Sequence, residues 1–360
     1  MTTYDIAPAR LQAQDILHPN AHSVHDVVAS MGAMQAQDYG GALWSIGLRM
    51  VSATVSSVED AIASRQIIRT WPMRGTLHVI PAEDAQWMLT LLTPRVMRSA
   101  ASREQRLELN DAIYARCFAI FRTAMSGGKA VLRSELLALL DAASITTASQ
   151  RGYHILWRAA QEGLICFGPM QGKQPTFVLL EEWAPKQRQI SSDEALAELA
   201  RRYVTSHGPT TERDFAGWAG LSLTEARTGI AASMAEVRQE TIDGTAYLMP
   251  RDMPLAIDEP SVFLLPGFDE FMLGYKDRSA ALHVDHAQKI VPGNNGMFLP
   301  TVILDGQVRG TWKRVLRKTS VAIQPIMFDG HKLSPSHERL LHEAADRYAA
   351  FLGVASSVVQ

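Results

Sequence analysis

Apolar positions between residues 112 and 183 follow a pattern that predicts one compact unit. They recur at helical spacing over 131–140, and 149–162 predicts a second helix that ends before Gly163, a residue favoured just past a helix C-terminus. Strands are predicted at 164–167 and 176–180, with a turn-rich stretch at 168–175 between them. This order is typical of a winged helix, in which the second helix would enter a DNA groove and the loop with Lys173 would form the wing.

The same order of elements is predicted in two other places. Near the N-terminus, helices at 9–17, 24–31 and 58–64 precede strands at 66–71 and 76–80. Farther on, helices at 193–204, 210–219 and 222–234 precede strands at 237–242 and 245–249, joined by Asp243-Gly244, a strong hairpin signal. Three such units in tandem favour a modular architecture.

After about residue 255 the pattern becomes that of a β-rich element. Strands are predicted at 262–273, 298–304, 307–312 and 321–328, with a hairpin turn at Asp305-Gly306 and a closing helix at 336–351. The fold class predicted is therefore α+β and mostly helical, with three tandem winged-helix modules, a C-terminal β-rich element and a closing helix. The boundaries expected are 1–110, 111–186 and 187–255 for the three modules and 256–360 for the C-terminal element with its basic hairpin.

Charge and composition narrow the classes of function. The chain is 47% hydrophobic and 20% charged, as expected of a globular protein, and its formal net charge of −2 excludes a globally basic nucleic-acid binder. Local basic stretches remain at 95–133 and 309–318. An ordinary solvated face is the alternative for each, but in a chain of winged helices they favour contact with phosphates.

Several other classes of site are disfavoured. Cys117 and Cys166 cannot form a disulfide framework or a zinc knot, and no apolar run approaches the ~18 residues of a membrane span. His283-Val-Asp-His286 lacks a third side for a metal site, and Gly127-Gly128-Lys129 lacks the earlier glycine of a P-loop. We therefore expect a cytoplasmic protein, nucleoid-associated when bound to DNA, with no metal, cofactor or membrane partner.

The most informative stretch for chemistry is 31–49. Gln35 and Gln37 flank Ala36, so the two amides can point to one side while Ala36 packs inward. Gly40-Gly41 follows, where a backbone could approach a ligand closely. The alternative is structural: a polar helix end or a loop whose amides satisfy backbone groups.

Together with motifs elsewhere, this stretch resembles the AlkZ-like family of tandem winged-helix DNA glycosylases, some of which unhook interstrand crosslinks. The resemblance covers nearly the whole chain and rests on Gln35-Ala36-Gln37, Trp44 and Arg49, the stretch 69–78, Leu264 to Glu270 and Asp305 to Trp312. It implies that Gln35 and Gln37 are catalytic and that the substrate is an N-alkylated purine in DNA. Some relatives carry Asp in place of the second glutamine, whereas here the acid is Asp38, one position later, which places the chain in the Gln/Gln branch.

Two neutral amides suit this substrate. An N7-alkylguanine is already cationic and leaves as a neutral base, so no strong acid is required. The remaining tasks are to hold a water and to tolerate positive charge on the sugar, which predicts a monofunctional glycosylase. A winged-helix transcriptional regulator or a non-catalytic resistance protein that shields lesions are the alternatives.

The expected partner is double-stranded DNA containing alkylated purines, bound by a monomer. Bulky adducts or crosslinks would be accepted on an open concave surface with little base flipping.

Trp71, Trp157, Trp218 and Trp312 are predicted to lie in the core, and local pairing is the alternative role for Arg74 and His78. Contacts with DNA are predicted for Arg49, Arg74, Thr76, His78, Lys173, Arg309, Lys313 and Arg314.

Overall fold

A computed structural model describes residues 2–253 and 259–359. Contacts divide the chain into two compact units: a larger unit, Met1–Val58 with Leu196–Gln360, and an inserted unit, Glu59–Ala195. The division falls within the predicted first module, whose helices at 9–17 and 24–31 belong to the larger unit while its strands at 66–71 and 76–80 belong to the inserted one. The predicted boundary between 255 and 256 lies outside the described residues.

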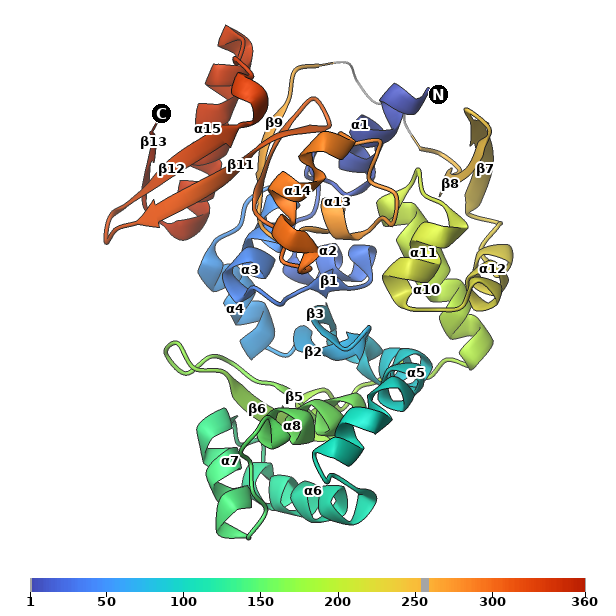
Figure 1. The fold of residues 1–360 in the computed structure, drawn as a ribbon, viewed down its shortest axis with the longest axis vertical. Coiled ribbons are helices and arrows are strands. Elements are labelled where there is room, and N and C mark those ends of the chain that lie inside the picture. The colour runs from blue at the N-terminus through green and yellow to red at the C-terminus, as the bar shows by residue number, and fades with distance from the viewer. Residues whose placement is uncertain (1, 254–258, 360) are drawn as a thin grey trace. The chain divides into compact units, whose positions relative to one another are not determined.

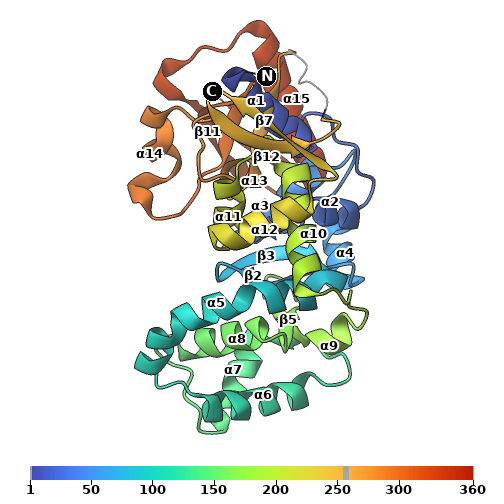
Figure 2. The same ribbon diagram turned by 90° about the vertical axis from the view of Figure 1, so that its right-hand side faces the viewer.

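The inserted unit is built on antiparallel strands in the order β3-β2-β5-β6-β4, because β2 pairs with β5 through Arg69 and Phe167. This pairing joins the hairpin of predicted module 1 to the sheet of module 2. Trp71 packs at its centre, 5.0 Å from the ring of Phe167, and is buried as predicted. The helices pack beside the sheet (Figure 2). The elements are β2 (Ile67–Met73), β3 (Thr76–Pro81), η1 (Ala82–Asp84), α5 (Ala85–Arg106), α6 (Asp111–Met125), β4 (Val131–Leu132), α7 (Arg133–Ala142), α8 (Arg151–Gln161), β5 (Ile165–Phe167), β6 (Thr176–Leu179) and α9 (Leu180–Trp183).

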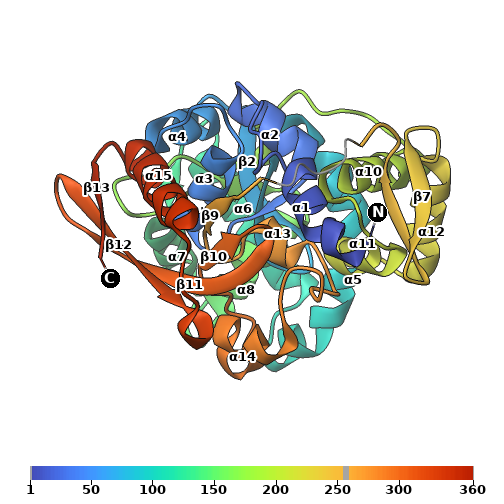
Figure 3. The same ribbon diagram turned by 90° about the horizontal axis from the view of Figure 1, so that it is seen from above.

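Along the chain, the larger unit begins with helices before and after a two-residue strand. It continues, after the inserted unit, with three helices followed by a β-hairpin. Helix α1 packs on this hairpin through Ile6, which lies in one cluster with Ile242, Tyr247 and Met249 (Figure 3). The predicted turn at Asp243-Gly244 is confirmed, with φ of 47° and 78°. The elements are α1 (Thr3–Ala13), α2 (Val24–Met31), β1 (Met34–Gln35), α3 (Tyr39–Leu48), α10 (Ser192–His207), α11 (Glu212–Ala219), α12 (Leu223–Ala232), β7 (Val237–Ile242) and β8 (Thr245–Pro250), while α4 (Val55–Ala63) and the start of α10 cross the divisions between units.

The C-terminal part of the larger unit is a five-stranded sheet in the order β13-β12-β11-β10-β9, curled and covered by α15 (Figure 1). The predicted β-rich element, its turn at Asp305-Gly306 and its closing helix are confirmed. The predicted strand over 262–273 is wrong beyond Leu265, because Pro266-Gly267 and a left-handed Phe268 (φ 64°) break it. The elements are β9 (Val262–Leu265), α13 (Glu270–Leu273), η2 (Val284–His286), α14 (Ala287–Ile290), η3 (Pro292–Asn294), β10 (Thr301–Leu304), β11 (Gln307–Leu316), β12 (Ser320–Met327), η4 (Phe328–Gly330), α15 (Pro335–Leu352) and β13 (Ala355–Val358).

Helix α3 was not predicted, since three glycines in ten residues disfavour a helix. Its stability comes from packing instead, because every residue from Gly41 to Leu48 is buried. A Cβ on Gly47 would lie 2.6 Å from Phe351 of α15, and one on Gly41 would lie 2.8 Å from the Asp38 carboxylate. At Gly41 the backbone therefore lies close to a side chain of the protein itself, the Asp38 carboxylate.

The chain is a mixed α+β protein in which helical residues outnumber strand residues. Among the described residues, no helix combines the length and the apolar character needed to cross a bilayer.

Candidate active site

The two glutamines lie on the connection from β1 to α3, which we call the glutamine loop (residues 35–38). Gln35 ends β1 and is partly buried, Ala36 is fully buried, and Gln37 is exposed. Asp38 occupies the position before the first turn of α3. The inward packing predicted for Ala36 is confirmed.

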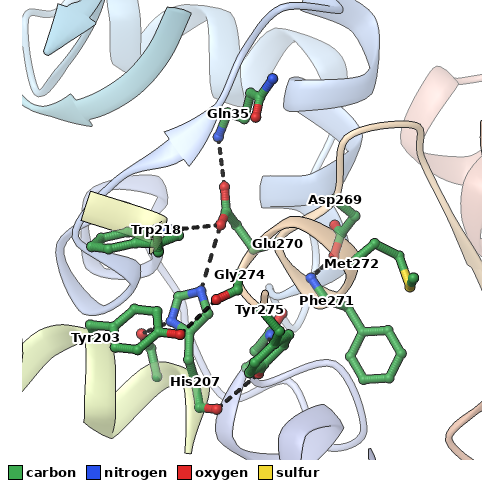
Figure 4. A network of polar contacts seen from close by, with 12 residues as sticks. Gln35, Tyr203, His207, Trp218, Asp269, Glu270, Phe271, Met272, Gly274 and Tyr275 are labelled. Atoms are coloured by element: carbon green, nitrogen blue, oxygen red, sulfur yellow. Dashed lines mark hydrogen bonds and ion pairs between the residues drawn. The ribbon is translucent and has the colours of Figure 1, made fainter. Parts of the chain in front are cut away.

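Glu270 holds the backbone of this loop. The Gln35 amide N–H donates to Glu270 Oε1 at 2.9 Å, and the Trp218 indole N–H donates to Oε2 at 2.9 Å. Glu270 is 0% exposed, so its carboxylate depends on these donors rather than on water. The Gln35 side chain points away from Glu270 (Figure 4), which leaves its amide group outside this contact.

His207 lies on the other side of Glu270, with Nε2 3.6 Å from Oε2. The Ser206 hydroxyl lies 2.7 Å from the Arg202 carbonyl, and Ser206 Oγ lies 2.8 Å from His207 Nδ1, within hydrogen-bond distance. Complete burial lowers the pKa of His207, although its contact with Glu270 opposes that shift. The ring is therefore neutral at neutral pH.

The neighbouring carboxylate, Asp269, forms a buried ion pair with Arg49. Arg49 Nη1 and Nη2 each lie 2.9 Å from one Asp269 oxygen, and the two side chains are 1% and 0% exposed. Arg49 also donates to Ser45 and Gln14. The prediction that Arg49 contacts DNA is wrong, because its guanidinium is enclosed by protein acceptors.

Consecutive acids thus hold both ends of the segment that carries the glutamines. Glu270 holds Gln35 before α3, and Asp269 holds Arg49 at the end of α3. Between them, the Trp44 indole donates to the Leu264 carbonyl at 2.8 Å. The turn at 264–270 therefore fixes the whole stretch from 35 to 49.

Basic residues of the β11–β12 hairpin lie in the same unit. Arg309 is partly buried, while Lys313 and Arg314 are exposed, as are Arg317 and Lys318 near the tip. A Cβ on Gly40 would lie 3.5 Å from Arg314 Nη2, and Arg314 also hydrogen-bonds to Tyr348. The structure thus brings Arg314 beside the start of α3, three residues after Gln37.

The other predicted DNA contacts lie in the inserted unit. Arg74 and Thr76 are partly buried at the β2–β3 turn, and Lys173 is exposed on the β5–β6 loop. His78 is 0% exposed, with Nδ1 2.9 Å from the Thr76 carbonyl and Nε2 3.3 Å from Arg74 Nη2. The prediction of DNA contact by His78 is wrong, because both ring nitrogens have partners within the hairpin.

Helix α8, the predicted recognition helix, is largely buried. It packs against β2, β5, α5 and α6, and Ile155, Trp157 and Ala160 are among its buried residues. Tyr153 is its exposed residue and Arg151, His154 and Arg158 are half-buried, so entry of this helix into a DNA groove stays a prediction. Trp157, Trp218 and Trp312 lie in the core as expected. Within residues 2–253 and 259–359, no group of three or more His, Cys, Asp or Glu side chains is placed to hold a metal ion.

Three residues around the glutamine loop were not predicted as site residues from the sequence: Glu270, Trp218 and His207. Glu270 ends the 264–270 motif, where two adjacent acids follow an apolar stretch. Two adjacent acids at the end of an apolar stretch could have indicated that their carboxylates are buried and paired with donors. His207 and Trp218 carried no comparable signal, because their contact with Glu270 is made only by the fold.

Comparisons with known proteins identify relatives of the chain. A family model described as "DNA glycosylase AlkZ-like" matches residues 28–351. In sequence, the chain is 26% identical over 374 residues to an interstrand DNA cross-link repair glycosylase of Streptomyces sahachiroi, covering 97% of this chain and 95% of that protein. Among solved structures, the Streptomyces sahachiroi DNA glycosylase AlkZ has the same fold, with a TM-score of 0.81, 23% identity and 100% of each chain covered.

Proposed function

The chain belongs to the AlkZ-like family of DNA glycosylases, and we propose that it is a monofunctional enzyme that hydrolyses the N-glycosidic bond of N7-alkylguanine and similar N-alkylated purines in DNA. Its similarity to a cross-link repair glycosylase extends the proposal to bulky adducts and interstrand crosslinks. The observation that carries it is the placement of Gln35-Ala36-Gln37 on a loop whose backbone is held by a buried carboxylate.

The chemistry assigned to the glutamines is positioning and electrostatic support. The bond from the sugar anomeric carbon to the base nitrogen breaks, and its electron pair neutralises the cationic alkylated ring. Water then adds to the anomeric carbon and releases a proton to solvent. The side-chain carbonyls of Gln35 and Gln37 accept hydrogen bonds from that water and face the positive charge on the sugar, effects that typically contribute about 10²-fold or more.

Contacts with DNA are proposed within each unit taken by itself. In the larger unit they involve Arg309, Lys313 and Arg314, and in the inserted unit Arg74, Thr76 and Lys173. The protein is proposed to be a monomer with three winged-helix modules. These are residues 1–110, 111–186 and 187–255, and helices precede a pair of strands in each. A duplex would be bound through its phosphates, which predicts weak, salt-sensitive affinity that is the same for all sequences.

The test is base release from a duplex that contains a single N7-methylguanine. Release of the base with an intact strand and an abasic site supports the proposal, as does resistance of the matched undamaged duplex. Binding to the lesion without release would identify a shielding protein instead. Affinity for one sequence ~10³-fold or more above random DNA, again without release, would identify a regulator.

A further inference from the structure

We propose that Glu270 is a positioning residue of this glycosylase, which fixes the glutamine loop through the Gln35 backbone and is itself oriented by Trp218. The inference rests on the proposed catalytic role of Gln35 and Gln37. It adds two residues, on α13 and α11, that do not touch the substrate but set the geometry of those that do.

A carboxylate is energetically costly at the buried position of Glu270. Glu270 is 0% exposed, and an isolated buried charge is strongly unfavourable unless donors compensate it. Donors reach both oxygens, Gln35 N–H on Oε1 and Trp218 Nε1–H on Oε2, both at 2.9 Å. Packing alone would be met by an apolar side chain, so the carboxylate serves a directional purpose.

A further support is the place where the contact acts. It is made to the main chain of Gln35, so the Gln35 side chain stays available and points away from Glu270 (Figure 4). The next residue, Ala36, is buried and prevents the loop from rotating outward. These two constraints fix the backbone positions from which both amides project, and a displacement of about 1 Å at a reacting group can cost about 10²-fold in rate.

The two oxygens of Glu270 predict how substitutions differ. A glutamine at 270 offers one acceptor and one donor where the carboxylate offers two acceptors. If its carbonyl faces Gln35, its NH₂ group opposes the Trp218 N–H; if it is turned over, it opposes the Gln35 N–H. Trp218→Phe removes one donor but keeps most of the ring that packs 4.9 Å from Tyr203, so it should disturb Glu270 with less change to the core.

The experiment measures single-turnover release of N7-methylguanine at saturating enzyme, the Kd for the same duplex, and the melting temperature. Glu270→Gln is expected to slow release by about 10²-fold and Trp218→Phe by about 10-fold, with Kd changed less than about 3-fold. The matched control is Glu104→Gln in the inserted unit, another buried glutamate that accepts a hydrogen bond from an aromatic residue, here Tyr114 at 2.9 Å. Its release rate should stay within about 2-fold of wild type.

The positioning role is overturned if Glu270→Gln, or Trp218→Phe where Glu270→Gln does not fold, releases base at the wild-type rate. It is also overturned if rate, affinity and melting temperature fall together, since that is the result of a purely structural role. Failure of the proposed function is distinct: wild type would release no base, or the Gln35→Ala and Gln37→Ala double variant would keep the wild-type rate, and either result removes both proposals. Gln35→Ala keeps the backbone N–H, so it tests the side chain alone.

Discussion

Replacing Asp269 with asparagine should destabilise the larger unit by about 3–5 kcal/mol, because it leaves the buried Arg49 without its counter-charge. The two side chains are 0% and 1% exposed, so water cannot take over the missing interaction. The pair also joins α3 to the turn before α13. Its loss should therefore loosen the segment that carries the glutamines.

The contacts of each Asp269 oxygen support that magnitude. Oδ1 accepts from Arg49 Nη2 and from the Phe271 amide, both at 2.9 Å, while Oδ2 accepts from Arg49 Nη1 at 2.9 Å and Ser45 Oγ at 2.6 Å. Asparagine can keep the Oδ1 contacts, but its NH₂ group would oppose both donors that Oδ2 accepts. Two hydrogen bonds to a charged carboxylate are lost, each typically worth about 1.5–3 kcal/mol, before the cost of the uncompensated charge.

The assay is urea unfolding, with hydrogen exchange of α3 peptides to assign the loss to the larger unit. The control is Glu212→Gln, which breaks the pair with Arg227 on the surface, where the side chains are 42% and 59% exposed. That change should cost less than about 1 kcal/mol. An Asp269→Asn protein that loses no more than the control would refute the role given to the buried pair.

Three further predictions follow from contacts in the larger unit. Gly47→Ala should lower the free energy of unfolding in urea by about 1–3 kcal/mol, because its Cβ would lie 2.6 Å from Phe351. The control Gly217→Ala in α11 has space for the added methyl group and should be neutral or stabilising. Equal costs for the two variants would contradict the close packing of α3. Lys313→Gln should lower the slope of log K against log salt by about 1, measured by fluorescence anisotropy on unmodified duplexes, and an unchanged slope would remove this residue from the DNA surface. His207 has a pKa below its ordinary 6.5, so as the pH falls below about 6.5 the unfolded chain gains a proton that the folded chain does not, and stability falls. Urea midpoints at pH 7.5 and 5.5 should therefore differ more in wild type than in His207→Gln, and an equal difference would contradict the burial effect.

Local patterns were sufficient to predict many elements of the fold. Val24–Met31 and both strands around Asp243-Gly244 were placed from periodicity and turn residues, because those signals are contained in the segments themselves. Helix α3 was not, since its glycines are favourable only where Phe351 and the 264–270 turn pack against them. Helix α5 was missed for a related reason: it contains Pro94, and it is stabilised by packing on β2 and α8.

The candidate site was predictable in part. The glutamines and the family were identified from motifs, and the family is confirmed by the comparisons. The burial of Arg49 was not predictable, because a buried arginine and an exposed one cannot be told apart in the sequence. Its partner Asp269 lies more than two hundred positions away and is brought beside it only by the fold. The same holds for Glu270, whose partners Gln35, His207 and Trp218 come from three separate segments.

In the proposed mechanism two neutral amides suffice, because the substrate base is already cationic. The most direct measurement is the single-turnover rate of N7-methylguanine release by wild type and by the Gln35→Ala and Gln37→Ala double variant, each compared with a duplex carrying a neutral damaged purine. We expect wild type to release the cationic base and not the neutral one, and the double variant to lose about 10²-fold or more in rate with its affinity for DNA retained. Equal rates for wild type and the double variant, or equal release of the neutral purine, would contradict the proposed mechanism.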